Sequence, residues 1–79
     1  MYIQVTIDLR HYVNKQFDLR LSNYYSIKKV IEIVWQVERI AVRPREGGWV
    51  RVSNKEKVCH GHVTLEESGI TNGDKLEIL

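Results

Sequence analysis

The chain of 79 residues is 43% hydrophobic and 28% charged, and it contains one proline. This composition predicts a single folded domain over residues 1–79 and argues against a disordered chain. The formal net charge is only +2, and acidic residues are interspersed among the basic ones, so charge gives no specific indication of nucleic-acid binding.

The sequence shows neither a signal peptide nor a membrane-spanning segment. Its first ten residues, MYIQVTIDLR, alternate apolar and polar side chains and lack the apolar block of a signal peptide. The most apolar stretch, residues 30–42, is interrupted by polar side chains, namely Glu32, Gln36, Glu38 and Arg39. Cys59 is the only cysteine, which excludes an intrachain disulfide. We therefore expect a cytoplasmic protein without direct membrane insertion.

Two segments near the N-terminus alternate strictly, as half-buried strands do. Residues 2–9 place four apolar side chains on one face: Ile3, Val5, Ile7 and Leu9. Residues 16–21 do the same with Phe17, Leu19 and Leu21. The polar segment 10–15 between them predicts an antiparallel hairpin with a medium-length loop.

Residues 27–39 are predicted to form an amphipathic helix, although their β-branched residues individually favour strands. Polar residues recur at spacings of three and four: Lys28, Lys29, Glu32, Gln36 and Arg39. The opposite side is apolar and consists of Ile27, Val30, Ile31, Val34 and Val37. Ser26 precedes the helix as the predicted N-cap, and Trp35 is interpreted as a residue at the border of the core.

The second half of the chain predicts three further strands. Pro44 and the pair Gly47-Gly48 mark a loop before a strand over residues 49–53, in which Val50 and Val52 face inward. A turn at 53–57 leads to a very short strand at 58–59. Residues 60–70 form a connection with room for one helical turn, anchored by Leu65 and Ile70. The Asn72-Gly73 turn then starts a last strand whose inward residues are Leu76 and Ile78.

The resulting order is strand, strand, helix, strand, short strand, strand. One helix must cover one face of one mixed sheet, because no other element can bury the inward side chains. The arrangement that closes this sheet places the first and last strands side by side in its middle. The sequence therefore predicts an α+β fold of the β-grasp type, with four to five strands packed on one helix.

Several segments carry a resemblance to known proteins. The helix start SIKKVIEIV and the ending TLEESGITNGDKLEIL resemble ubiquitin. The segments MYIQVTIDLRHY, FDLRLSNY, IKKVIEIVWQ, PREGGWVRVSNKEKV and GITNGDKLEIL are similar, in order, to the YukD/EsaB family, small ubiquitin-like proteins of type VII (WXG100, or ESX-like) secretion systems in Gram-positive bacteria. The resemblance implies an accessory protein whose partners are membrane proteins or an FtsK/SpoIIIE-like ATPase of that machine, and it supplies no catalytic residues.

The C-terminal residues bear on the choice between function classes. Ubiquitin and the related sulfur carriers act through a flexible tail ending in Gly-Gly, whereas here the last residues belong to the predicted final strand and Gly47-Gly48 is internal. We expect an interaction module that is not conjugated to targets. A protein modifier or sulfur carrier acting through the C-terminus is the alternative. A nucleic-acid-binding regulator is a weaker third, suggested only by the pI of about 8.8.

No enzymatic or metal chemistry is predicted. The segment CHGH contains Cys59, His60 and His62 but has no second ligand pair at a spacing suited to zinc. Adjacent strand residues point to opposite faces, so Cys59 and His60 do not form a nucleophile pair. Nucleotide-binding glycine motifs are absent as well. We expect a non-enzyme without a cofactor.

The outer face of the sheet is a candidate protein-binding surface. If Val50 and Val52 face inward, then Trp49 and Arg51 face outward near Gln4, Thr6 and Glu77. Ubiquitin has an isoleucine in its apolar patch where this sequence has Arg51, which argues against binding by ubiquitin-type receptors. Trp49 is interpreted either as a contact residue of a mixed aromatic and basic surface or as a lone exposed tryptophan.

Basic residues complete the set of candidate contacts. Arg43 and Arg45 precede Trp49 in the loop. Lys28 and Lys29 fall in the first turn of the helix, where the helix dipole favours acidic residues. These two lysines indicate either an ordinary solvated face or a basic spot directed at an acidic partner.

Overall fold

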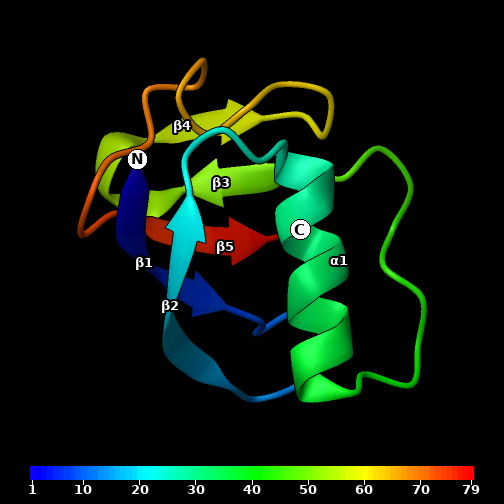
Figure 1. Cartoon of the computed structure of the whole chain (residues 1–79). Coiled ribbons are helices and arrows are strands. Elements are labelled where there is room, and N and C mark those ends of the chain that lie inside the picture. The colour runs from blue at the N-terminus through cyan, green and yellow to red at the C-terminus, as the bar shows by residue number, and fades with distance from the viewer.

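One α-helix covers one face of a five-stranded sheet in the computed structural model, which describes residues 1–79 (Figure 1). The elements follow the predicted order. They are β1 (Tyr2–Asp8), β2 (Gln16–Ser22), α1 (Ile27–Glu38), β3 (Val50–Val52), a 3-10 turn (Ser53–Lys55), β4 (Lys57–Cys59) and β5 (Lys75–Ile78). No helix is both long and apolar enough to cross a membrane.

The sheet has the order β2-β1-β5-β3-β4. The first and last strands are neighbours and run parallel, with Ile7 beside Leu76, while the other neighbouring pairs are antiparallel. The prediction of a β-grasp fold with β1 and β5 in the middle of the sheet is therefore confirmed. Because β2 and β4 form the two edges, their outer backbone groups have no strand partner.

The core lies between α1 and the covered face of the sheet. Every inward residue predicted for β1, β3 and β5 is buried, and α1 contributes Ile27, Val30, Ile31 and Val34. Leu65 and Ile70 anchor the connection between β4 and β5, as predicted. Phe17 and Leu19 pack against this core but are only partly buried, because they lie on an edge strand.

The start of α1 matches its sequence signal. The Ser26 side chain accepts a hydrogen bond of 3.1 Å from the backbone N–H of Lys29, which is the predicted N-cap geometry. At the other end the helix stops at Glu38, because Arg39 adopts a left-handed conformation with φ 51°. The predicted helix boundary is therefore one residue too long.

One prediction about a side chain on α1 is wrong. Val37 was expected on the buried stripe, but it is 57% exposed. In the last turn Glu38 lies four residues after buried Val34 and shares its face, so the helix turns Val37 toward solvent. The connection 60–70 holds one helical turn, as predicted: the Ser68 N–H donates to the Thr64 carbonyl at 3.0 Å, and Thr64 and Glu67 exchange two capping hydrogen bonds. A 3-10 turn also forms at Ser53–Lys55, within the stretch predicted as a simple turn.

Candidate protein-binding site

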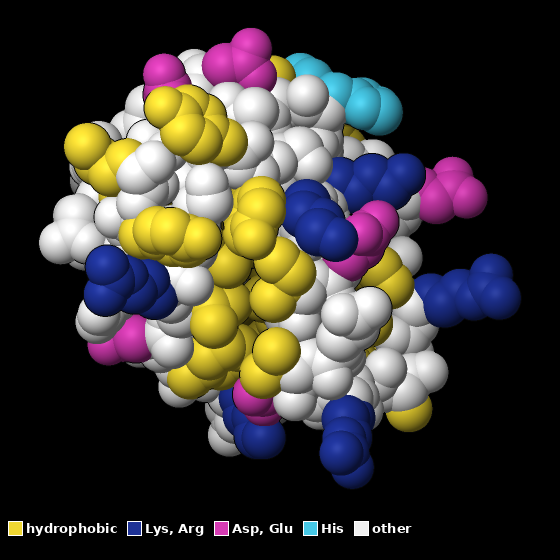
Figure 2. All heavy atoms as spheres, viewed as in Figure 1, with side chains coloured by type: hydrophobic (Ala, Val, Ile, Leu, Met, Phe, Trp, Pro, Cys, Tyr) yellow, Lys and Arg dark blue, Asp and Glu magenta, His cyan; other side chains and the backbone are white.

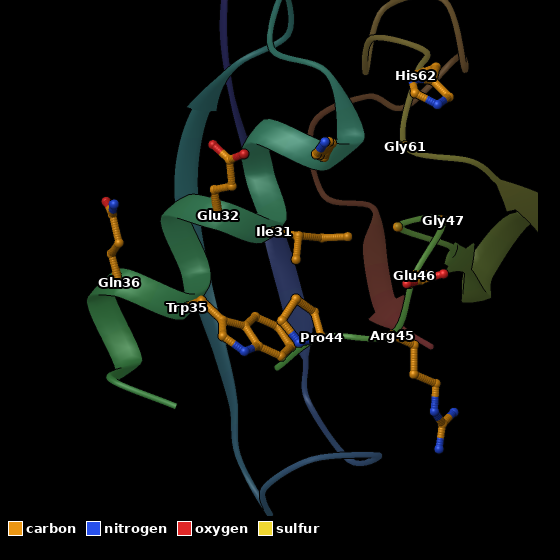
Figure 3. A pocket seen from close by; sticks show the side chains of 12 residues that line it. Ile31, Glu32, Trp35, Gln36, Pro44, Arg45, Glu46, Gly47, Gly61 and His62 are labelled. Atoms are coloured by element: carbon orange, nitrogen blue, oxygen red, sulfur yellow. The ribbon is translucent and has the colours of Figure 1, made fainter. Parts of the chain in front are cut away.

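An open groove of about 600 Å³ lies between α1 and residues 44–48, hereafter the α1 groove. Its apolar lining comes from Ile31, Trp35 and Pro44. Figure 3 shows Ile31 extending from α1 toward Gly47 and the Trp35 ring lying beside Pro44. The groove therefore offers an apolar floor to a partner side chain.

Trp35 of α1 is hydrogen-bonded to the loop that forms the other side of the groove. Its indole N–H donates a hydrogen bond of 2.8 Å to the carbonyl of Val42, and its ring meets that of Tyr12 edge to face at 4.8 Å. An aromatic pair of this geometry adds roughly 0.5–1.5 kcal/mol beyond its apolar burial, and both rings here are partly buried. The interpretation of Trp35 as a residue at the border of the core agrees with its partial burial.

Tyr12 connects the same loop, at Arg45, to Leu79 at the end of β5. Its hydroxyl accepts a hydrogen bond of 2.9 Å from the backbone N–H of Arg45 and donates one of 2.8 Å to the carbonyl of Leu79. The Arg45 guanidinium lies 5.9 Å from the centre of the Tyr12 ring. Two side chains from different elements thus fix residues 42–45, so the α1 groove is formed before any partner arrives.

Glycines close the end of the groove that faces β4. The N–H of Gly61 donates to the Gly47 carbonyl at 3.0 Å, and the Gly61 carbonyl accepts from the Lys28 N–H at 3.1 Å. A Cβ at position 61 would lie 3.0 Å from that Gly47 oxygen and 3.3 Å from Lys28 Cβ. Only glycine lets the helix and the two loops approach this closely without displacement.

The six predicted contact residues do not form one surface. Lys28 lines the α1 groove, and so does Arg45, whose side chain points away from the helix in Figure 3. Trp49 is 47% exposed and covers Gly47 at the groove rim, with its ring 5.9 Å from that of His60. Arg43 is exposed on the loop between α1 and β3.

Lys29 lies outside the groove lining, although it is exposed in the same helical turn as Lys28. Its ammonium is 4.0 Å from the carboxylate of Glu32, and both side chains are more than half exposed. Such a pair contributes little to stability. Lys28 and Lys29 therefore form a matched pair, one inside the candidate site and one outside it.

Arg51 belongs to a separate ionic cluster on the uncovered face of the sheet. Its guanidinium lies 3.7 Å from Glu77, and His11 Nε2 lies 2.6 Å from the same carboxylate oxygen. Glu77 points outward as predicted but is only 5% exposed, because these neighbours cover it. Arg51 thus faces outward near Glu77, as predicted, with its side chain half exposed, and it is a counter-ion of this buried carboxylate; its role as a protein-binding residue stays a prediction.

A second buried carboxylate extends the cluster along β1. Asp8 is 3% exposed and accepts hydrogen bonds from the Arg10 side chain, the shorter at 2.6 Å, while the Lys75 ammonium lies 3.6 Å away. The Arg10 hydrogen bonds lower the pKa of Asp8, against the opposing effect of burial. The hydrogen bond to His11 lowers the pKa of Glu77, and Arg10 and Arg51 lower it further.

These lowered pKa values predict loss of stability in acid. A carboxylate whose pKa is lower in the folded state stabilises the fold above its unfolded pKa, and this contribution is lost as the pH falls through the folded value. We expect the free energy of unfolding, measured by urea denaturation, to fall steeply below about pH 4. Glu77→Gln should reduce this acid slope, because position 77 then no longer titrates; an unchanged slope would contradict the assignment.

The CHGH segment does not assemble a reactive site. Cys59 is buried, whereas the rings of His60 and His62 are exposed and 5.9 Å apart. Cys59 and His60 thus face opposite sides, as predicted. No group of three or more His, Cys, Asp or Glu side chains is arranged to hold a metal ion.

Sequence reasoning missed two residues that shape the groove. Tyr12 lies in the otherwise mostly polar segment 10–15. A tyrosine in such a segment indicates that the loop packs against another part of the fold. Gly61 lies between two histidines and carries no comparable signal, because the need for glycine arises only when Gly47 and Lys28 approach it.

Comparisons with known proteins agree on one family and one fold. The family described as "WXG100 protein secretion system (Wss), protein YukD" matches residues 2–78. The "ESX secretion system protein YukD" of Bacillus subtilis (strain 168) is 58% identical over 79 residues, covering 100% of both chains. Among solved structures, a de novo designed protein based on ubiquitin superposes with a TM-score of 0.73 at 19% identity, over 99% of this chain and 87% of that one.

Proposed function

Because this chain belongs to the YukD family of WXG100 secretion-system proteins, we propose that it serves such a system by binding other proteins non-covalently. Its partners would be membrane proteins of the secretion machine, or an FtsK/SpoIIIE-like ATPase, reached from the cytoplasm. The protein would act as an accessory interaction module and not as an enzyme.

The preformed α1 groove is the observation that supports this proposal. It combines an apolar floor with charged side chains of both signs on its border, namely Lys28, Arg45, Glu32 and Glu46. The two cations among them, Lys28 and Arg45, make no ion pair within the chain and so are available to a partner. Exposed Trp49 adjoins it through Gly47, and tryptophan and arginine are the residues most enriched at energetically important contacts. A partner segment with an apolar side chain next to a carboxylate would complement both features.

Leu79 is held by two main-chain contacts: its N–H donates to the Trp49 carbonyl at 3.0 Å, and its main-chain oxygen accepts from the Tyr12 hydroxyl. The alternative, a protein modifier or sulfur carrier, differs in its product, because it would leave covalent adducts that carry this chain.

Replacing Lys28 with glutamate should separate binding from stability. The first turn of α1 contains no acidic residue, so the helix dipole favours Lys28→Glu, while repulsion from Glu32 four residues later opposes it, and the stability should change by less than about 1 kcal/mol. The same change should weaken binding to a purified soluble domain of the secretion machine by about tenfold or more, in titration calorimetry, since it reverses a charge in the groove.

The matched control is Lys29→Glu, in the same helical turn but outside the groove lining. It should likewise change the melting temperature little, because the helix dipole favours it while loss of the weak Lys29–Glu32 pair and repulsion from Glu32 oppose it, and it should leave the binding constant unchanged. Equal weakening by both variants would indicate long-range charge attraction instead of the groove. Unchanged binding by Lys28→Glu would rule the groove out as the contact site.

A further inference from the structure

Strand β2 is an edge without the usual protection against pairing. It is seven residues long and contains no proline, glycine or lysine, the residues that commonly disrupt edge pairing. The opposite edge, β4, has only three residues, and its Lys57 ammonium is hydrogen-bonded to the Ser68 carbonyl. The two edges of the sheet therefore differ in their capacity to accept another strand.

The hydrogen bonds at the two ends of the hairpin show which backbone groups of β2 are free. Leu9 N–H donates to the Lys15 carbonyl at 3.0 Å, and Asn23 N–H donates to the Met1 carbonyl at 2.9 Å. With the observed register, in which Leu19 lies opposite Val5, the odd-numbered residues of β2 bond to β1. The N–H and C=O groups of the even-numbered residues, Asp18 and Arg20 among them, point outward from the sheet.

Apolar side chains border this edge on the side of the helix. Phe17 and Leu19 of β2 and Ile33 of α1 are only partly buried, and Val37 is 57% exposed. Figure 2 shows hydrophobic side chains gathered between β2 and α1, with Lys or Arg side chains on either side of them. A strand added to β2 would cover part of this apolar surface.

We propose that the strand which pairs with β2 is β2 of a second copy of this chain, antiparallel about a two-fold axis at Leu19. In this register Asp18 lies opposite Arg20 of the other copy, and the reverse pair follows from the symmetry. Gln16 and Ser22 also meet, so all seven residues of the strand are paired. The backbone groups of the opposed Gln16, Asp18 and Arg20 point away from β1, whereas the Ser22 carbonyl at the end of the strand already accepts from the Tyr25 N–H.

Two neighbouring registers would also pair even-numbered residues with one another, but both are disfavoured by charge. A shift of two residues in one direction places Asp18 opposite Asp18 of the other copy, and a shift in the other direction places Arg20 opposite Arg20. Like charges directly opposite each other on neighbouring strands are destabilising. Neither side chain forms an ion pair within its own chain. Asp18 accepts a hydrogen bond from the Thr6 hydroxyl at 2.7 Å, and the Arg20 guanidinium lies 5.8 Å from the Tyr2 ring centre.

The dimer would join two five-stranded sheets edge to edge, with both helices on the same face. Ile33 and Val37 lie on the helix flank toward β2, whereas Ile31 and Trp35 line the α1 groove on the other flank. Pairing through β2 would therefore leave both grooves open. This inference does not depend on the function proposed for the groove.

Charge reversal in matched variants tests the proposal. Sedimentation equilibrium of the 79-residue chain over a concentration series should show reversible dimers. Asp18→Arg and Arg20→Asp should each raise the dimer dissociation constant by about tenfold or more, because each replaces attractive pairs with repulsive ones. An equimolar mixture of the two variants should restore the dimer as a heterodimer. Amide exchange at positions 18 and 20 should slow as the wild-type concentration rises.

Both substituted residues are exposed, so the fold should survive, as melting curves of each variant would show. Val58→Asp, on the opposite edge strand β4, is the control and should dimerise like the wild type. Val37→Glu provides a second disrupting variant that leaves β2 unchanged. A chain that stays monomeric at millimolar concentration, single variants that dimerise normally, or a mixture that does not recover would each overturn the proposal; in the monomeric case β2 would be free for a strand of another protein.

Discussion

Ile31→Asp is expected to unfold the domain. Ile31 is 4% exposed and lies on the face of α1 that packs on the sheet. Placing an aspartate there buries a charge or a protonated carboxyl without a partner, at a cost of several kcal/mol. Because small domains have a total stability of about 5–15 kcal/mol, this single change should remove most or all of the thermal transition.

Glu32→Ala, one position along the helix, is the control for this experiment. The Glu32 side chain is 55% exposed, and its one ion pair, with Lys29, is weak at 4.0 Å. Its loss should therefore change the free energy of unfolding by less than about 0.5 kcal/mol. Circular dichroism melting curves of the two variants give the comparison. If Ile31→Asp melted like the parent, the assignment of the buried helix face would be wrong.

Asp74→Ala should produce the second large loss of stability. Asp74 is 3% exposed and accepts hydrogen bonds from Asn54 Nδ2 at 2.7 Å and from the Thr71 backbone N–H at 2.8 Å, and its carboxylate lies 2.8 Å from the Lys55 ammonium. Burial by itself would raise the pKa of Asp74, but these partners hold it below its usual value. Removing the carboxylate leaves several donors unpaired.

We expect Asp74→Ala to lower the free energy of unfolding by about 2–4 kcal/mol, somewhat less than for a fully buried ion pair because Lys55 reaches solvent. Urea denaturation at neutral pH measures the loss. Asp74→Asn keeps one acceptor oxygen and should recover part of it. A change near zero for the alanine variant would show that the turn before β5 does not need this carboxylate.

The fold was predictable because apolar periodicity and turn chemistry agree along most of the chain. The alternation in residues 2–9 and the Asn72-Gly73 turn both identify strands that the structure contains. The polar residues of 27–39 outweighed the β-branched propensity of the same segment. Val37 shows the limit of the method, because a residue at the border of an apolar stripe is assigned to core or solvent only by what packs against it.

The site was less predictable, because it depends on which segments meet in space. The alternation of apolar and polar residues correctly predicted that Arg51 and Glu77 face outward. It could not show that His11, distant in the sequence, covers Glu77. Lys28 and Lys29 are equivalent in sequence, and only the position of residues 44–48 distinguishes them. The α1 groove itself results from contacts of Tyr12 and Trp35 that no local pattern encodes.

The most direct test of surface binding as the mode of action is a secretion measurement. A strain would carry this chain with Lys28→Glu and Trp49→Ala in place of the wild type, and the amount of WXG100 substrate in the medium would be quantified. We expect a strong reduction in secretion with an unchanged cellular level of the variant chain, and normal secretion in a Lys29→Glu strain. Normal secretion by the strain that carries both substitutions would contradict binding through the α1 groove.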